Sequence, residues 1–433
     1  MAFTIGLLGL GTVGTGTAEI LLNSAGRNAL LAEVEIYRVG VRSLDKLRDI
    51  AFPREILTTD LEAIVSDPQV DIVVELIGGI EPARSLILKA IASGKHIVTA
   101  NKAVIARHGD EIYKAANEAG VYVLLEAAVG GGIPILQPLK QSLGANRIQR
   151  VTGIINGTTN YILTQMKEAG RDFGDVLAEA QHLGYAEADP TADVDGFDAA
   201  DKISILASLA FGDRIRYEDI EREGIRQINT TDITYADRLG FAIKLLAIAQ
   251  KDSHTHNSLQ VRVGPTLVPY KHPLASVNGV YNAIFVEGDP LGQVMFFGPG
   301  AGKGATASAV VADILNIVAL LKSIDASKGA HPLYGCFHQD YAAVTPIDEL
   351  ETKFYARFLC GDRPGVLGHL GTCFGNNEVS LESLVQIGFQ GDRAEVVVVT
   401  HDVREGNFRK AVDAIHEFES VDDIKVASIL RVF

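Results

Sequence analysis

Short apolar runs recur through the first third of the chain, separated by segments with helical periodicity. The runs lie at residues 3–8, 34–41, 70–77, 96–99 and 121–125. Runs of this length and composition are typical of strands buried in a parallel sheet. Their alternation with helical segments predicts an α/β fold, with an N-terminal Rossmann-like parallel sheet in a domain over residues 1–133.

The pattern changes after residue 133. Alternating apolar and polar positions predict a largely antiparallel sheet, with strands at 259–263, 283–287 and 293–297. A further strand is expected at 148–155, followed by a polar loop at 156–160 and a helix that begins near Tyr161. We therefore expect an α+β domain over residues 134–304. A sheet of this kind often leaves one face free for a partner subunit, so dimerisation is expected there, and the acids around Lys202 described below make it the candidate substrate-binding and catalytic domain.

The tail predicts a third domain over residues 353–433. Strands are expected at 353–359, 383–388, 394–400 and 424–432, with helices after residue 365 and at 407–418. This order, βαββαβ, is that of a ferredoxin-like unit.

Length, charge and cysteine content limit the kinds of protein that this chain can be. The chain has 433 residues, too many for one core, and a net charge of −15 without a basic run, which disfavours nucleic acid and anionic membranes as partners. Cys336, Cys360 and Cys373 show no paired metal spacing, although a redox role stays open. No signal peptide or apolar run of membrane-spanning length is apparent, so a cytoplasmic protein is expected.

A glycine motif follows the first predicted strand. Gly9, Gly11 and Gly14 form GxGxxG around Thr12 and Val13, and a helix follows. The glycines permit a tight turn, close approach to a pyrophosphate and close helix packing, so the motif predicts dinucleotide binding. The alternative is a glycine-rich structural turn.

The second strand ends on Arg42, with Lys46 and Arg48 nearby. An acid at this position suits the ribose hydroxyls of NAD, whereas an arginine suits a 2′-phosphate, so NADP is favoured and NAD stays possible. Alternatively, Arg42 is a solvated strand end.

Ligands of open α/β sheets bind beyond the carboxyl ends of the strands. This rule places Gly78, Lys102 and Glu126 at the binding edge. Lys102 is a candidate active-site lysine or a solvated loop lysine. Glu126 opens a glycine-rich bend whose carbonyls suit a hard cation or form a hinge.

A second glycine-rich loop contains Gly302 and precedes an apolar segment at about 305–335. This segment predicts a helix that returns to complete the first domain. The loop either closes over the cofactor or serves as a packing turn.

The densest group of acids surrounds Lys202. Asp198 and Lys202 are four residues apart, so on a helix they share one face. A lysine at the head of an apolar helix is a candidate for desolvation, which lowers a lysine pKa and favours proton transfer. The alternative is an ordinary cap beside a solvated ion pair.

The stretch around this pair carries a family resemblance. It contains Ala180, Gly184-Tyr185-Ala186, Asp189-Pro190, Asp193-Val194, Gly196, Asp198 and Lys202, and it resembles the signature of the homoserine dehydrogenases. The resemblance extends over essentially the full chain. The turn Asp362-Arg363-Pro364-Gly365 resembles that of an ACT domain.

The resemblance implies roles for particular residues. Lys202 transfers the proton, Asp198 pairs with it, Lys102 is a second active-site lysine, and Glu187 and Asp193 bind the substrate with them. Gly184 and Gly302 fall at positions that contact the cofactor. A sodium or potassium ion is implied at Glu126, Val129, Gly131 and Ile133.

The implied reaction is NAD(P)H-dependent interconversion of L-aspartate 4-semialdehyde and L-homoserine, in threonine, methionine and isoleucine biosynthesis. The ACT-like tail, with Asp362, Gly365 and Val366, implies feedback inhibition by L-threonine, and a homodimer or homotetramer is expected. Two alternatives stay open: another NADP-dependent oxidoreductase of an amino-acid-derived aldehyde, or a non-catalytic sensor of nucleotide and amino acid. A sensor has no need for Lys202 and Asp198 at one helix head.

Overall fold

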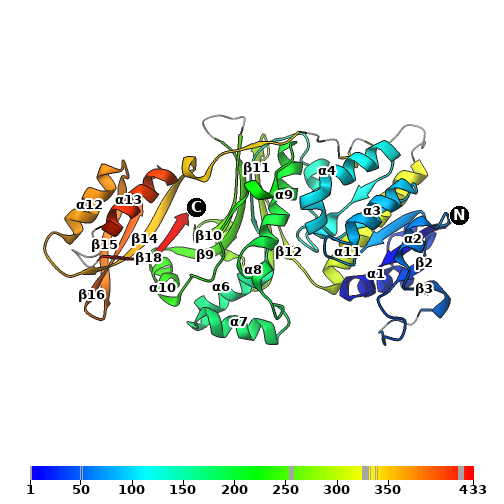
Figure 1. The fold of residues 1–433 in the computed structure, drawn as a ribbon, viewed down its shortest axis with the longest axis horizontal. Helices are drawn as coiled ribbons and strands as arrows, with labels where there is room; N and C mark the ends of the chain where they lie inside the picture. Colours follow the sequence, from blue (N-terminus) through cyan, green and yellow to red (C-terminus); the bar gives the residue numbers. More distant parts are fainter. Residues whose placement is uncertain are drawn as a thin grey trace. The chain divides into compact units, whose positions relative to one another are not determined.

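A computed structural model describes residues 2–48, 50, 52–252, 258–323, 331, 333–336, 338, 340–417 and 424–433 (Figure 1). The chain divides into two compact units. The first unit comprises Met1–Gly157, Asp198–Ile220 and Val280–Ala342, and the second comprises Thr158–Phe197, Glu221–Gly279 and Ala343–Phe433. The chain therefore enters each unit three times.

The first unit contains the predicted parallel sheet. Its strands are β1 (Phe3–Leu8), β2 (Val34–Gly40), β3 (Leu57–Thr58), β4 (Ile72–Glu75), β5 (His96–Thr99) and β6 (Val123–Leu124). All neighbours pair in parallel, in the order β3-β2-β1-β4-β5-β6. The strand order reverses between β1 and β4, and dinucleotides bind at this point in such sheets. The Rossmann-like prediction is confirmed.

The first unit also contains helices, several of which pack on this sheet. They are α1 (Thr12–Leu22), α2 (Leu61–Ser66), α3 (Ala83–Ala92), α4 (Lys102–Ala119), α5 (Leu136–Lys140), α9 (Phe197–Phe211) and α11 (Lys303–Ser323). Val310 and Ile314 of α11 are buried in the same core as Ile5 and Leu7 of β1. A Cβ atom at Gly16 would lie 2.8 Å from the carbonyl oxygen of Lys303, so glycine permits the close packing of α1 and α11.

The returning helix differs from its predicted range. It begins at Lys303, and the described residues between 331 and 335 are not helical, while 324–330 lie outside the described residues. Within the described part of the chain, α11 is also the one helix long and apolar enough to cross a membrane, which contradicts the expectation from sequence. Its apolar residues instead complete the core of the first unit, as in the central helix of a globular domain.

Three antiparallel strands complete the first unit. They are β7 (Arg147–Ile154), β11 (Tyr281–Asp289) and β12 (Gly292–Pro299), with β11 in the middle. The strand predicted at 148–155 and the antiparallel strands predicted at 283–287 and 293–297 are thus confirmed. The helix expected near Tyr161 begins earlier, because α6 spans Gly157–Ala169. Most of the predicted polar loop is therefore the first turn of α6.

The second unit contains a mixed sheet. Its long strands are β9 (Phe241–Lys251), β10 (Ser258–Pro269), β14 (Glu351–Gly361), β15 (Leu381–Gln390), β16 (Arg393–Thr400) and β18 (Lys425–Val432), in the order β9-β10-β18-β14-β16-β15. The short strands β8 (Glu221–Arg222) and β13 (Ala343–Val344) pair with β10, and β17 (Val403–Arg404) pairs with β14. The helices are α6, α7 (Phe173–His182), α8 (Thr191–Val194), α10 (Thr230–Arg238), α12 (Val366–Asn376) and α13 (Glu405–Glu417).

Apart from the two-residue strand β17, the tail has the predicted βαββαβ order, from β14 to β18 (Figure 1). Stacked rings of Phe354 and Phe408, with centroids 4.0 Å apart, lie in its core. Arg357 of β14 is buried and pairs with Asp232 of α10 and with Glu395 of β16, each at 2.9 Å. An ion cluster therefore anchors the tail to the rest of the second unit.

Candidate active site

Two helices of the first unit bring three predicted residues together. Lys102 is the first residue of α4, directly after β5, and Asn101 caps this helix by accepting a hydrogen bond from the N–H of Val104. Asp198 and Lys202 lie in the first turns of α9. The strand end and the two helix starts thus converge on one point.

Asp198 is the centre of this group. Its Oδ2 accepts hydrogen bonds from Lys202 Nζ at 2.7 Å and from Asn156 Nδ2 at 2.9 Å, and its Oδ1 lies 3.1 Å from Lys102 Nζ. Lys202 Nζ also donates to the carbonyl oxygen of Ile155 at 2.7 Å. The side chains of Asp198 and Lys202 are 9% and 12% exposed, whereas that of Lys102 is 37% exposed.

Charge keeps the carboxyl group of Asp198 ionised. Burial acts to raise its pKa, but Lys202 and Lys102 outweigh burial and hold the pKa below its ordinary value. Asp198 is therefore a carboxylate at neutral pH that orients two lysines. Such a site can stabilise negative charge on a substrate oxygen and can supply a proton to it.

The Rossmann motif borders a cavity of about 580 Å³. Of the predicted cofactor residues, Gly9, Gly11, Arg42 and Gly78 line it, together with Ser43, Lys46, Arg48, Glu81 and others. Thr12, Val13 and Gly14 form the start of α1 and are not among its lining residues. A Cβ atom at Gly14 would lie 2.1 Å from the carbonyl oxygen of Gly9, so the motif needs glycine there.

The cavity is basic where β2 ends. Arg42, Lys46 and Arg48 line it, and Glu81 is its one acidic residue among those described. Arg48 donates to the carbonyl oxygens of Ser43 at 2.5 Å and Lys46 at 2.8 Å, which stabilises the loop that follows Arg42. This charge distribution fits an anionic group such as a 2′-phosphate.

Glu75 connects the cavity edge to the start of α4 and was missed in the sequence. Its buried carboxylate accepts hydrogen bonds from the N–H groups of Ile77 and Gly78 and from Thr99 Oγ1, at 2.8, 3.2 and 2.6 Å. Asn101 Nδ2 donates to the carbonyl oxygen of Gly79 at 2.7 Å. The only sequence signal was an acid at the end of an apolar strand.

The glycine-rich bend around Glu126 suits a monovalent cation. Glu126 accepts from the N–H groups of Ile135, Leu136 and Gln137 at 2.5, 2.8 and 2.8 Å, and its own N–H donates to Asp313 at 2.7 Å. Val129 and Ile133 are buried, as is Gly131, whose left-handed backbone approaches Gly300 closely.

The charges around this bend support the same fit. Burial raises the pKa of Glu126 and of Asp313, and Asp313 Oδ1 is buried without a hydrogen-bond donor among the described residues. Lys140 is the one cation among the groups that influence both acids. Burial disfavours the ionised forms of both acids, and a cation bound in this bend would favour them.

The remaining predicted residues are distributed over both units. Glu187 is exposed, Asp193 lies in α8, and Gly184 follows α7 with φ 76°, all within the second unit. Gly302 precedes α11 in the first unit with φ 116°, and it does not line the cavity beside the Rossmann motif. In the tail, Asp362 and Gly365 are exposed and Val366 is the buried first residue of α12.

One further charged pair near the site was not predicted. Arg107 of α4 lies 2.7 Å from Asp201 of α9. The three-residue spacing of Asp198 and Asp201 was its only signal in the sequence.

Comparisons with known proteins agree with this geometry. The family model for the NAD-binding domain of homoserine dehydrogenase matches residues 9–126, and the homoserine dehydrogenase model matches residues 134–315. A homoserine dehydrogenase of Synechocystis sp. is 65% identical over 433 residues, with 100% of both chains covered.

Solved structures give the same result. The crystal structure of a homoserine dehydrogenase from Thiobacillus denitrificans matches with TM-score 0.92 and 42% identity, covering 100% of this chain and 98% of that chain. A hyperthermophilic archaeal homoserine dehydrogenase mutant in complex with NADPH matches with TM-score 0.62 and 29% identity, covering 75% of this chain and 99% of that chain. Because sequence and structure agree over the full length, the chain belongs to the homoserine dehydrogenase family of NAD(P)-dependent oxidoreductases that act on a CH–OH group.

Proposed function

We propose that this chain interconverts L-aspartate 4-semialdehyde and L-homoserine with Lys202 as the proton-transferring residue. The observation that carries this assignment is the buried carboxylate of Asp198, held between Lys202 and Lys102. When bound, the reduced nicotinamide supplies the hydride that the aldehyde carbon accepts. Lys202 then gives a proton to the oxygen, directly or through a water, which completes the alcohol.

The other residues orient this step. Asp198 holds Lys202 in place by accepting its hydrogen bond. Asn156 orients Asp198 by donating to it, and the carbonyl oxygen of Ile155 orients Lys202 by accepting from it. Lys102 is the more exposed lysine and adds positive charge where the alkoxide forms. Glu187 and Asp193 are proposed to bind the substrate, with Glu187 at its amino group, which favours an amino acid aldehyde over other aldehydes.

NADPH is the proposed reductant. The basic edge formed by Arg42, Lys46 and Arg48 supports this choice, as does the NADPH complex of the archaeal relative. The experiment is to compare kcat/KM for NADPH and NADH in the wild type and in Arg42→Ser. The substitution should lower kcat/KM for NADPH about 10- to 100-fold and leave NADH within about twofold, because one charge-assisted contact to the 2′-phosphate is lost. Equal losses with both cofactors would contradict the role of Arg42.

A sodium or potassium ion is proposed in the bend formed by Glu126, Val129, Gly131 and Ile133. Backbone carbonyls of the last three residues would hold it, and its charge would favour the ionised forms of Glu126 and Asp313, which burial disfavours. Replacing sodium and potassium by choline should lower the melting temperature of the protein, because a ligand that binds the native state stabilises it. An unchanged melting temperature would remove the cation from the proposal.

Feedback inhibition by L-threonine through an ACT-like tail is also proposed, with Asp362, Gly365 and Val366 near the effector. Cutting the chain at residue 353 is a poor test, since β18 pairs with β10 and Arg357 with Asp232. Asp362→Ala is preferable because its side chain is exposed. We expect weaker inhibition by threonine, with an unchanged rate in its absence.

A homodimer or homotetramer and a cytoplasmic location remain predictions. Light scattering of purified protein tests the oligomeric state.

A further inference from the structure

A second ion pair joins the two helices that carry the catalytic lysines. Arg107 Nη1 of α4 lies 2.7 Å from Asp201 Oδ1 of α9, while Lys102 of α4 lies 3.1 Å from Asp198 of α9. Arg107 is five residues after Lys102, and Asp201 is three residues after Asp198 and directly before Lys202. The two pairs therefore run side by side between the same helices.

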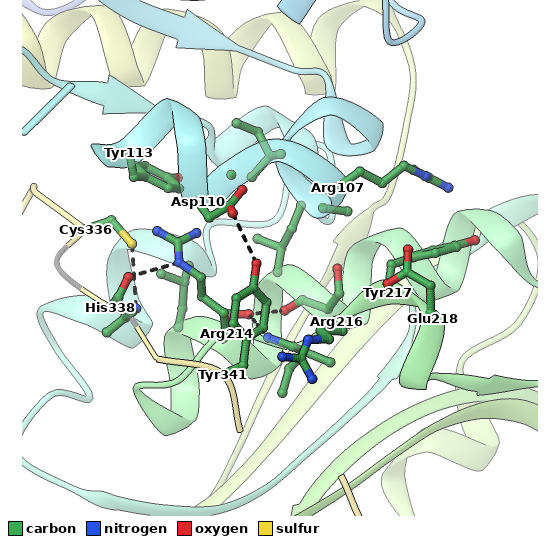
Figure 2. Close-up of a pocket in the computed structure, with 18 residues that line it drawn as sticks. Arg107, Asp110, Tyr113, Arg214, Arg216, Tyr217, Glu218, Cys336, His338 and Tyr341 are labelled. Atoms are coloured by element: carbon green, nitrogen blue, oxygen red, sulfur yellow. Dashed lines mark hydrogen bonds between the residues drawn. The ribbon is translucent and has the colours of Figure 1, made fainter. Parts of the chain in front are cut away.

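Arg107 is held in place from several directions. Its guanidinium lies over the ring of Tyr217, 4.1 Å from the ring centroid, and its Nη1 also donates to the carbonyl oxygen of Ala103 at 3.2 Å. Figure 2 shows Arg107 extending from α4 toward Tyr217. Its side chain is 30% exposed, whereas that of Asp201 is 9% exposed. A fixed arginine thus faces a largely buried carboxylate.

Direct packing between the helices is interrupted next to this pair. A cavity of about 90 Å³ lies there, lined by Ile105 and Gly109 of α4, by Ser204 and Ser208 of α9, and by Arg214 and Tyr113 among others (Figure 2). Close-packed apolar side chains therefore do not fix the spacing of α4 and α9 beside Arg107. The ion pair between Arg107 and Asp201 is the contact between the two helices there.

Asp201 also belongs to the charge balance of the site. Burial raises its pKa, and Arg107 and then Lys102 oppose that effect, while Asp198 adds to it. Asp201 Oδ1 receives no well-aligned hydrogen bond from the described residues, so the charge of Arg107 is its main compensation. Without Arg107, a buried carboxylate would be left near Lys102 and would compete with Asp198 for it.

We propose that Arg107 and Asp201 are a positioning pair for the reaction: the ion pair fixes α4 against α9 and keeps Asp201 from drawing Lys102 away from Asp198. Neither residue is assigned contact with substrate or cofactor. The inference rests on the proposed function, because it assumes that Lys102, Asp198 and Lys202 do the chemistry.

The experiment compares Arg107→Gln, Asp201→Asn and the double variant in homoserine oxidation. Arg107→Gln should lower kcat about 10- to 30-fold, since it leaves the carboxylate of Asp201 unpaired. Asp201→Asn and the double variant should both stay within about fivefold of the wild type, because neither contains that carboxylate. The double variant is therefore expected to be more active than Arg107→Gln alone.

A pH profile separates positioning from general loss of structure. Lowering the pH from 8 to 6 should raise the activity of Arg107→Gln relative to the wild type, because protonation neutralises the unpaired Asp201. Glu111→Gln is the matched control, since Glu111 of α4 pairs with Arg84 of α3 outside the site and should leave kcat unchanged. If Arg107→Gln does not fold, Arg107→Lys replaces it, with an expected loss of about threefold and the same direction in the pH profile.

Two results would overturn the proposal. One is a kcat for Arg107→Gln equal to that of the control. The other is a double variant as slow as Arg107→Gln, with a loss independent of pH. Lys202→Met in the same assay distinguishes the two levels of inference: retained activity there refutes the catalytic assignment itself, whereas an inactive Lys202→Met beside a fully active Arg107→Gln refutes only the positioning pair.

Discussion

Each compact unit buries a cluster of charged side chains, and the two clusters have opposite compositions. In the first unit, one carboxylate, Asp198, lies between two lysines. In the second unit, one arginine, Arg357, lies between the carboxylates of Asp232 and Glu395. The first cluster is open to solvent through Lys102, which is 37% exposed, whereas Arg357 is 4% exposed.

This difference separates chemistry from anchoring. Two lysines outweigh the effect of burial and lower the pKa of Asp198, whereas burial raises the pKa of Asp232 despite the opposing charge of Arg357. Lysine can exchange a proton in a catalytic cycle, but arginine stays protonated and forms rigid, bidentate contacts. The ratio of acids to bases and the type of base are the features on which the proposed function assigns the chemistry to the first cluster.

The largest expected effect on kcat comes from replacing Lys202 of the first cluster. Lys202→Met should lower kcat about 10³-fold, equivalent to ~4 kcal/mol of barrier, because the proton donor is lost. The melting temperature should change little, since Lys102 still compensates Asp198. Steady-state kinetics and thermal melts check this, with Lys322→Met, which breaks an exposed pair with Glu33, as control. A kcat close to that of the control would contradict the role of Lys202.

Replacing Arg357 of the second cluster should lower stability and leave kcat nearly unchanged. Arg357→Met leaves two buried carboxylates unpaired and should lower the free energy of unfolding by about 3–4 kcal/mol. The kcat of the folded fraction at low temperature should stay within about twofold, because the anchoring cluster takes no part in the reaction. Urea unfolding and kinetics at 10 °C measure the two quantities. A large loss of kcat with unchanged stability would invert the comparison.

Neutral replacements of the acids sharpen the contrast. Asp198→Asn leaves Lys202 and Lys102 close together without a counter-charge and should lower kcat about 10²-fold, or ~2.7 kcal/mol. Asp232→Asn should cost only about 1 kcal/mol of stability and leave kcat unchanged, because burial already favours the neutral form of that group. Equal effects of the two substitutions on kcat would show that cluster composition does not predict function.

The smallest effect concerns a half-buried histidine, His96. Burial lowers the pKa of His96 to about 4, against the opposing charge of Asp71, and its Nδ1 accepts the N–H of Tyr122. Between pH 6.5 and pH 4 the histidine therefore binds a proton more readily in the unfolded chain than in the folded one. The free energy of unfolding falls as the pH is lowered through this range. The loss between pH 7 and pH 5 should be about 2 kcal/mol.

Urea unfolding at pH 7 and pH 5 measures this loss. The difference between the two pH values should shrink by that amount in His96→Gln, which keeps a hydrogen-bond acceptor and cannot be protonated in this range. An equal pH dependence in the variant would assign the effect to other groups.

Local pattern was sufficient for much of the fold. The strand-glycine-helix sequence around Gly9 predicted β1 and α1, and β5 was predicted at its observed bounds. The predicted start of α6 near Tyr161 was wrong, because the polar residues 156–160 were interpreted as a loop. A Cβ atom at Gly157 would lie 2.8 Å from the carbonyl oxygen of Val280, so this glycine permits a tertiary approach that no local pattern contains.

The candidate site was predictable to the same extent. Asp198 and Lys202 share a helix face, so their contact followed from spacing, and the position of Lys102 followed from the strand-end rule. Arg107 and Asp201 were not found because they pair across two helices, and Glu75 was not found because its burial and its contact with Thr99 of β5 depend on the packed sheet. Their roles depend on the spacing of packed helices and on burial, which become visible only in three dimensions.

The close approach of α11 to Gly16 has a consequence for synthesis in the cell. The helix that completes the core of the first unit is encoded about 180 residues after β6. At roughly 5–20 residues per second, a ribosome needs ~10–40 s to reach it. During that interval the nascent sheet has an uncovered apolar face, so the N-terminal segment is a candidate chaperone client and is unsuitable for expression as an isolated nucleotide-binding domain.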